Sequence, residues 1–224
     1  MQAGLRPRYT FAEYVELERR SSEVKHEYVA GEICAMAGGS VEHSALASAL
    51  LGLVFGQLRG GPCRPHGSDL QISIRAAEVA TYADLAVVCD PIERDAESPN
   101  HVTNPRVVVE VLSPSSERYD REQKRLYYQQ LDSLREYGLV AQDRRHVEVW
   151  RREGEGWIFA AHESGGRASM RREPQGAETR SASASSRLRT RRISACKPER
   201  GGSSPVTPAS GAAPIVITGI GARR

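Results

Sequence analysis

The chain has 224 residues and a formal net charge of +3, which is enough for one domain of ordinary size and an additional segment. The charge is uneven, because residues 165–224 hold 11 Arg and one Lys against three Glu, or +9, which leaves residues 1–164 at −6. The acidic body argues against a broad phosphate-binding surface and still permits a local basic cleft.

The four cysteines, Cys34, Cys63, Cys89 and Cys196, include no Cys-x-x-Cys pair. We expect reduced thiols rather than a disulfide framework, and their spacing offers no zinc site. The N-terminus lacks the basic-then-apolar pattern of a signal peptide, and no apolar run approaches the length that spans a membrane. These features predict a soluble cytoplasmic protein with no membrane contact.

The beginning of the chain predicts a helix and a hairpin. Thr10 and Glu13 have the spacing of a capping box, which predicts a helix over about residues 11–20. Two short apolar segments flank Ala30-Gly31, and this pattern is typical of a β-hairpin.

A second helix is expected after Ser40, which can cap it, and before Gly60-Gly61, which end it. His43 lies in the first turn of this helix. The apolar stripe expected to face the core consists of Leu46, Leu50, Leu53, Val54 and Leu58.

The middle of the chain predicts mainly strands. Alternating apolar and polar residues indicate a half-buried strand over 68–74, and a second strand is expected over 82–88. A polar, proline-containing surface loop over 91–105 precedes a β-branched strand around residues 107–112, buried on both faces. The remaining expected elements are a helix over about 119–131 and strands over 136–140, 146–150 and 156–161. This order predicts an α/β (α+β) domain with a mixed central β-sheet flanked by helices.

The composition changes after Gly165, where Arg, Ser, Ala, Gly and Pro dominate. We therefore expect a domain over residues 1–164 and a tail over 165–224 that buries too little apolar surface to fold. Two other interpretations of the tail stay open. Its composition also fits an out-of-frame reading of a GC-rich gene, and the Arg-rich stretch 187–192 fits nonspecific phosphate binding.

Three residues predict a chemical site. Glu110 lies within a buried strand, where a carboxylate is costly unless it is paired or coordinates a metal. Asp84 lies in a second apolar strand, and two such carboxylates can hold Mg²⁺, with the carbonyl of Val111 as a third ligand. Lys124, on the helix that follows, would orient a water molecule or stabilise charge on a phosphate.

These segments resemble the PD-(D/E)XK nuclease superfamily and, more closely, the Uma-two type restriction endonuclease family. The resemblance runs from about Tyr9 to Phe159, and its most specific segment is Glu110-Val-Leu-Ser-Pro-Ser. The other matching segments occur in the family's order: Thr10-Phe-Ala-Glu-Tyr, His26-Glu-Tyr-Val-Ala-Gly-Glu-Ile, Met36-Ala-Gly-Gly-Ser with His43, Gly67-Ser-Asp-Leu, Tyr82-Ala-Asp-Leu-Ala-Val-Val and Asp120-Arg-Glu-Gln-Lys.

The resemblance implies a restriction-endonuclease-like core and a metal-dependent endonuclease that hydrolyses phosphodiester bonds in DNA. It implies Mg²⁺, or Mn²⁺ in its place, DNA as the partner, a homodimer as one arrangement, and no organic cofactor. The metal ligands it implies are Asp84 and Glu110, to which our interpretation of the residues adds the carbonyl of Val111. It gives the role of the superfamily lysine to Lys124, because Leu112 stands at the usual position.

Glu27 in the early hairpin and His43 are two further candidates for the catalytic site. Each residue of the set also has an ordinary structural explanation: Asp84 could end a strand, Glu110 could pair with an arginine, and Lys124 could be an exposed helix residue. Only their joint occurrence favours a site.

A catalytically silent nucleic-acid-binding or protein-interaction module that keeps the fold is the competing interpretation. Ala83, where the family has proline, and the unusual tail favour it. The intact set of Asp84, Glu110 and Lys124 speaks against it.

Overall fold

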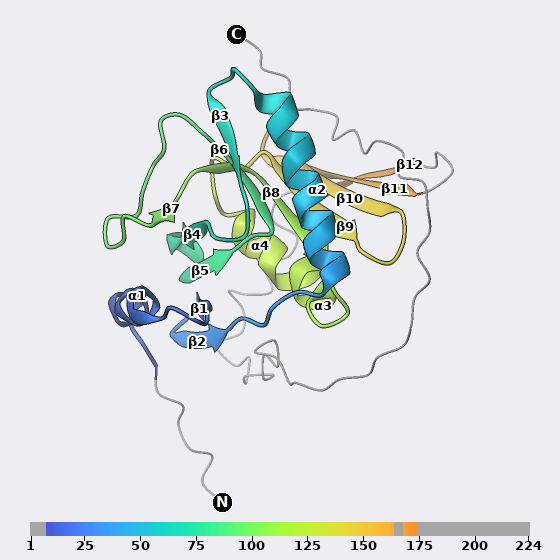
Figure 1. Ribbon diagram of the computed structural model, residues 1–224. Helices are drawn as coiled ribbons and strands as arrows, with labels where there is room; N and C mark the ends of the chain where they lie inside the picture. The colour runs from blue at the N-terminus through green and yellow to red at the C-terminus, as the bar shows by residue number, and fades with distance from the viewer. Residues whose placement is uncertain (1–7, 164–167, 174–224) are drawn as a thin grey trace, which may run out of the picture.

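The structure is a computed structural model that describes residues 8–163 and 168–173, with side chains described up to residue 163. Two mixed β-sheets and a few helices form an α+β fold (Figure 1). The elements in chain order are α1 (Phe11–Arg20), β1 (His26–Val29), β2 (Glu32–Ala35), α2 (Val41–Leu58), β3 (Cys63–His66), β4 (Gln71–Ile74), the 3₁₀ turn η1 (Arg75–Ala77), β5 (Val79–Tyr82), β6 (Leu85–Cys89), β7 (His101–Val102), β8 (Pro105–Leu112), α3 (Glu117–Tyr119), the π-helical turn η2 (Asp120–Lys124), α4 (Arg125–Tyr128), β9 (Glu136–Ala141), β10 (His146–Glu153), β11 (Gly156–Glu163) and β12 (Ala168–Glu173).

The larger sheet has the strand order β12-β11-β10-β9-β8-β6-β3 and is covered by helices on both faces (Figure 1). Strand β8 is buried on both faces, as predicted, and its side chains alternate between two apolar clusters. Val107, Val109 and Val111 pack with α2, whereas Val108 and Leu112 pack with residues from α4 and the turn after it. The prediction of a mixed central sheet flanked by helices is confirmed.

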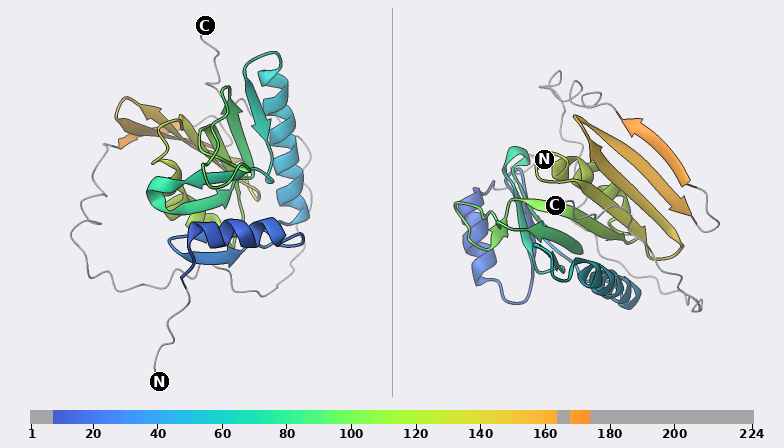
Figure 2. Two further views of the ribbon diagram at one scale, coloured as in Figure 1. Left: turned by 90° about the vertical axis from the view of Figure 1, so that its left-hand side faces the viewer. Right: turned by 90° about the horizontal axis from the view of Figure 1, so that it is seen from above.

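A second sheet, with the order β2-β1-β5-β4-β7, was not anticipated. Helix α1 packs on it, with Phe11 and Tyr14 against Tyr28 and Ala80 (Figure 2). The predicted capping box of Thr10 and Glu13 is present at the start of α1. The β1–β2 hairpin turns at Ala30-Gly31 as predicted, and both residues have positive φ, the conformation that a tight two-residue hairpin turn requires.

The predicted strand over 82–88 is broken. The chain leaves the smaller sheet at the end of β5 and enters the larger sheet at the start of β6, with Ala83 and Asp84 at the junction. Asp84 therefore lies between two strands rather than inside one. The apolar run on both sides of Asp84 conceals this change of sheet, because both strands are almost completely buried.

The predicted helix over 119–131 is a helical segment over 117–128 with a π-helical turn, η2, in its middle. The hydroxyl of Tyr137 on β9 donates to the Asp120 carbonyl at 2.9 Å. A side chain that inserts at a backbone carbonyl in this way is one of the known causes of helix distortion. The segment nevertheless places both Asp120 and Lys124 in the interior, as their spacing predicted.

Several details of the predicted core are wrong. Leu53 is 44% exposed, while Leu50, Val54 and Leu58 of α2 are buried. The strand predicted as half-buried is buried over Ile72–Ile74: Ile72 and Ile74 belong to the main apolar core, and the Ser73 hydroxyl donates to the buried carboxylate of Asp95. The loop predicted over 91–105 contains β7 and a buried His101.

The prediction of reduced thiols is wrong for Cys63 and Cys89, which form a disulfide. The two residues are opposite each other in the antiparallel β3–β6 pair, so the sheet brings together cysteines that are 26 residues apart in sequence. β3 was not predicted, so the pairing of Cys63 with Cys89 could not be anticipated from the sequence.

Strand β12 corrects the prediction for the tail at residues 168–173, which pair antiparallel with β11. The other residues of the predicted tail lie outside the described residues. The expectation that no apolar run approaches the length that spans a membrane is wrong for α2. Its 18 residues, with a mean hydropathy of 1.3, are long and apolar enough to cross a membrane. The core helices of globular proteins meet the same two criteria, and α2 contributes Leu50, Val54 and Leu58 to the core of this fold.

Candidate active site

Asp84 is held at the junction between the two sheets by contacts with three neighbours. Its Oδ2 accepts a hydrogen bond from the Val111 N–H at 2.7 Å and lies 3.2 Å from Nε2 of His43. Its own N–H donates to Oε2 of Glu110 at 3.3 Å. The two carboxylates predicted to act together are therefore adjacent, and Val111 enters the site through its N–H. The use of its carbonyl as a metal ligand stays a prediction.

Glu110 and Lys124 form a buried ion pair beneath Asp84. Each residue is at most 5% exposed. Nζ of Lys124 lies 3.0 Å from Oε1 of Glu110 and 3.4 Å from Oε1 of Glu27, and it donates to the carbonyl of Tyr82 at 2.8 Å. The helix over 117–128 thus returns to the end of β8, which the prediction for Lys124 required.

The lysine has more acidic neighbours than it can neutralise. Glu27, Asp84, Glu110 and Asp120 all act electrostatically on this cluster. Burial raises the pKa of Glu110 well above its ordinary value, and Lys124 only partly offsets this. Burial also raises the pKa of Asp120. For Lys124, burial works to lower the pKa, and the carboxylates of Glu110 and Glu27 outweigh it, so that the lysine stays charged.

One oxygen of this cluster is poorly satisfied. Oε1 of Glu110 is buried and, although it is close to the lysine ammonium, it has no hydrogen bond of normal geometry. A buried carboxylate that shares one ammonium with other acids is more typical of a functional site than of a purely structural pair. Glu110 therefore differs from a carboxylate that only stabilises the fold.

Glu27 is brought into the site by the hairpin, as predicted. Its Oε1 accepts a hydrogen bond from the hydroxyl of Thr81 and also faces Lys124. Thr81 was missed in the sequence, because a threonine in an apolar strand is typical of β structure and carries no further signal.

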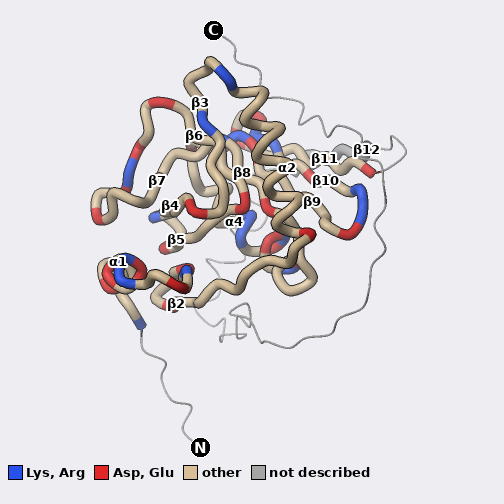
Figure 3. Tube along the Cα trace, viewed as in Figure 1, with Lys and Arg blue, Asp and Glu red and all other residues tan. Residues whose placement is uncertain are grey.

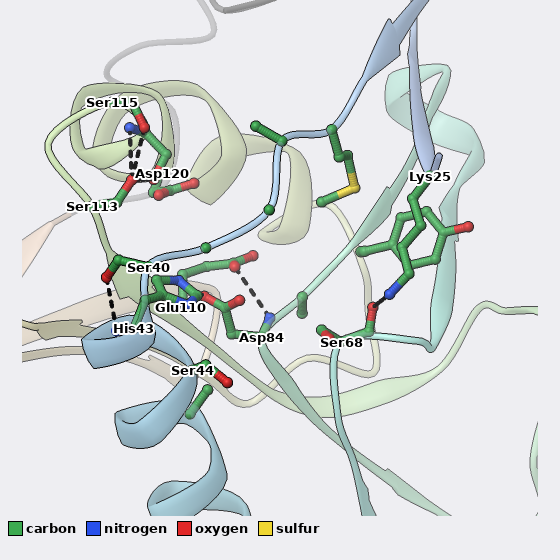
Figure 4. A pocket seen from close by; sticks show the side chains of 18 of the residues that line it. Lys25, Ser40, His43, Ser44, Ser68, Asp84, Glu110, Ser113, Ser115 and Asp120 are labelled. Carbon is green, nitrogen blue, oxygen red and sulfur yellow. Dashed lines mark hydrogen bonds and ion pairs between the residues drawn. The ribbon is translucent and has the colours of Figure 1, made fainter. Parts of the chain in front are cut away.

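His43 faces the same cleft from the first turn of α2, as predicted. Its backbone N–H donates to the hydroxyl of the capping residue Ser40 at 3.2 Å. Figure 4 shows His43, Asp84 and Glu110 close together at the start of α2, with Ser113, Ser115 and Asp120 on the opposite wall. All five side chains predicted for the site, Glu27, His43, Asp84, Glu110 and Lys124, therefore line one cleft.

The cleft has a volume of about 840 Å³ and an acidic lining. Six carboxylates and two lysines line it: Glu23, Glu27, Asp69, Asp84, Glu110, Asp120, Lys25 and Lys124. Lys25 is already paired with Asp69. Helix α2 adds no positive charge, and its tube has the neutral colour for almost its whole length (Figure 3).

The donor set suits a hard cation with few protein ligands. Among residues 8–163 and 168–173, no group of three or more His, Cys, Asp or Glu is arranged to hold a metal ion. Mg²⁺ commonly uses one or two carboxylates and completes its shell with water or phosphate oxygens. Asp84 and Glu110 can supply those two carboxylates, and the unsatisfied Oε1 of Glu110 fits such a role.

The comparison with family models gives a match over residues 11–179 to the Uma2 family, whose description is "Putative restriction endonuclease". The chain belongs to the Uma2 family. The match includes all five side chains of the cleft and extends past residue 164, where we predicted the domain to end. The family resemblance found in the sequence is thereby confirmed.

Two similar proteins have names that state no activity. Two proteins of Synechocystis sp., both named uncharacterized, are 37% and 32% identical, over 74% and 65% of this chain and 86% and 82% of their own lengths. A solved structure described as a putative nuclease belonging to DUF820, from Anabaena variabilis, has a TM-score of 0.48 and 19% identity, over 73% of this chain and 84% of its own.

Proposed function

We propose that this member of the Uma2 family is a divalent-cation-dependent endonuclease that hydrolyses phosphodiester bonds in DNA. The observation that carries the proposal is the buried cluster in which Lys124 meets the carboxylates of Glu110 and Glu27, directly beneath Asp84. A buried excess of carboxylates is costly for folding, and such an arrangement is typical of functional sites.

The charge of the cleft favours a cation as part of the reaction. A phosphodiester brings further negative charge to a wall that already has six carboxylates, of which two lysines can balance only a part. We infer that Asp84 and Glu110 hold Mg²⁺ or Mn²⁺, with Val111 as a further ligand. When bound, such an ion polarises the phosphate and lowers the pKa of a water molecule.

The residues of the chain supply the rest of the proposed mechanism. Lys124 stays protonated, so it acts as a fixed positive charge that stabilises charge on the phosphate or orients water, rather than as a base. Glu27 and the Tyr82 carbonyl hold its ammonium in place. His43 and Asp120 also line the cleft, where His43 contacts Asp84 and the buried Asp120 adds to the negative charge around Lys124.

A plasmid-nicking assay with Mg²⁺ or Mn²⁺ tests the proposal. We expect the wild type to nick or linearise supercoiled DNA, and Asp84→Asn, Glu110→Gln and Lys124→Ala each to reduce the rate by about 10²–10³-fold, the effect typical of one electrostatic group in an active site. Asp132→Asn, which neutralises an exposed carboxylate outside the cleft, is the matched control and should cleave like the wild type.

Equal cleavage by all variants would disprove the assignment of the site. If the wild type cleaves no form of DNA but binds it, the chain is the silent nucleic-acid-binding module instead. The localisation in the cytoplasm and the formation of a homodimer remain proposals, and gel filtration of the purified chain measures the second directly.

A further inference from the structure

His43 and Val111 both contact the same oxygen of the Asp84 carboxylate. Oδ2 of Asp84 lies 2.7 Å from the Val111 nitrogen and 3.2 Å from Nε2 of His43. This approach favours the tautomer with hydrogen on Nε2, because two acceptors at this distance would repel each other. Neither of the two contacts involves Oδ1 of Asp84.

The place of the imidazole depends on a glycine. A Cβ atom at Gly39 would lie 2.8 Å from Nδ1 and 3.1 Å from Cγ of His43, which is too close for both groups to keep their positions. Gly39 does not have a positive φ, so the backbone there does not require glycine. The requirement is for space. At the neighbouring Gly38, a Cβ atom would have no contact within 4 Å.

The helix that carries His43 is anchored at its first turn and along one apolar face. Ser40 caps its first turn, and Leu50, Val54 and Leu58 pack on the larger sheet. Beyond its end, the disulfide of Cys63 and Cys89 ties β3 to the end of β6, the strand that begins after Asp84. A histidine on a rigid helix can hold a partner more accurately than one on a loop.

We propose that His43 is a positioning residue that orients Asp84 through an Nε2–H hydrogen bond, and that Gly39 is retained to give the imidazole space. This inference rests on the proposed function, since it makes Asp84 a cation ligand whose outer partner is His43. Outer partners of this kind fix a carboxylate in the orientation that binds a metal. His43 thus acts through Asp84 and is not the base that activates water.

Isothermal titration calorimetry of the full chain with MnCl₂ tests the proposal without an activity measurement. His43→Ala is expected to weaken Mn²⁺ binding by about 10–100-fold, the usual effect of losing an outer partner. His43→Gln should retain most of the affinity, because the amide nitrogen of glutamine can donate from a similar position. Gly39→Ala should weaken binding like His43→Ala, since it displaces the ring, whereas the matched control Gly38→Ala should not change the affinity.

A second measurement tests the contact between His43 and Asp84 independently of metal binding and DNA cleavage. In ¹⁵N NMR spectra of the metal-free protein, we expect hydrogen on Nε2 of His43 and a shift of the His43 ring signals in Asp84→Asn. If the wild type binds no Mn²⁺ and cleaves no DNA, the proposed function fails, while a His43 signal that responds to Asp84→Asn still supports the positioning role. The role is overturned if folded His43→Ala binds Mn²⁺ as tightly as the wild type, or if Asp84→Asn leaves the His43 signals unmoved.

Discussion

Two buried carboxylates of this chain have opposite environments. Asp95 accepts hydrogen bonds from Nε and Nη2 of Arg75 at 2.6 and 2.5 Å, from the hydroxyl of Ser73 at 2.7 Å and from the N–H of Glu97 at 2.9 Å. Burial works to raise its pKa, and these donors outweigh burial and lower it to about 2. Glu110 depends on the single ammonium of Lys124, which Glu27 also contacts, and burial raises the pKa of Glu110 well above its ordinary value.

The two environments distinguish a buried carboxylate that stabilises the fold from one whose surroundings suit the site that we propose. Asp95 is 6% exposed and lies away from the cleft. Both of its carboxylate oxygens accept hydrogen bonds, so its charge contributes to the stability of the fold. Glu110 lies on the cleft and shares one lysine with other acids, so its charge costs stability, and the cation that we propose would offset this cost. The exposed fractions of Asp95 and Glu110, 6% and 3%, do not distinguish the two residues.

The largest expected effect comes from removing the cluster of Glu110. The double variant Glu110→Gln, Lys124→Met should lose about 10³-fold in DNA cleavage, or about 4 kcal/mol of transition-state stabilisation. Its free energy of unfolding should be unchanged or higher by about 1 kcal/mol, because buried ion pairs with high desolvation costs are often replaced without loss. Urea unfolding beside the nicking assay measures both quantities. A large loss of stability would show that the cluster is structural.

The second-largest effect is expected for Asp95, where stability should fall and cleavage should stay unchanged. Asp95→Ala leaves Arg75, Ser73 and the Glu97 N–H without their acceptor, and we expect a loss of about 3 kcal/mol in the free energy of unfolding. Cleavage per folded molecule should stay at the wild-type level, since Asp95 does not line the cleft. Urea titration monitored by circular dichroism gives the stability. A stability equal to that of the wild type would contradict the comparison.

The third effect is the pH dependence of stability, for which the two acids have opposite signs. The pKa of Asp95 is lowered from 3.8 to about 2, so its contribution is present above pH 3.8 and is lost as the pH falls towards 2, about 2 kcal/mol in all. The pKa of Glu110 is raised, so its ionisation reduces stability as the pH rises above its ordinary value of 4.5. Urea unfolding between pH 2 and 8 should lose the acidic slope in Asp95→Asn and the opposite slope in Glu110→Gln.

The smallest effect is expected for Thr81→Val, which removes the hydroxyl that donates to Glu27 and preserves the volume of the side chain. We expect a loss of about 1 kcal/mol in stability, the typical net value of one hydrogen bond. The decrease in cleavage should be smaller than that of Lys124→Ala, because Glu27 keeps its contact with the lysine. Parallel thermal melts and nicking assays check this, and a loss equal to that of Lys124→Ala would place Thr81 in the catalytic machinery.

Elements that depend on residues close together in the sequence were predicted correctly. The capping box of Thr10 and Glu13, the turn at Ala30-Gly31 and the cap at Ser40 all depend on neighbours within a few residues, and all three are present. The buried strand around Glu110 was equally clear, since an uninterrupted β-branched run has few alternatives.

Contacts between distant segments could not be predicted in the same way. The break at Asp84, the Cys63–Cys89 disulfide and the donors around Asp95 all depend on how the two sheets meet. The residues of the site were identified in the sequence, whereas Thr81 was not, and Gly39 was noted only within the segment Met36-Ala-Gly-Gly-Ser, without a role. A glycine that leaves space for a ring four residues later has no signature of its own.

The π-helical turn over Asp120–Lys124 makes the number of residues in this segment important, in addition to their identity. Each residue of an α-helix advances the chain by about 100°, so the deletion of one residue before Lys124, with the form of the turn kept, would rotate the Lys124 side chain by about that angle. The ammonium of Lys124 would then leave Glu110, even though every side chain of the cluster was still present. We therefore expect a one-residue deletion between Ser113 and Lys124 to break the ion pair, although many surface segments tolerate changes in length.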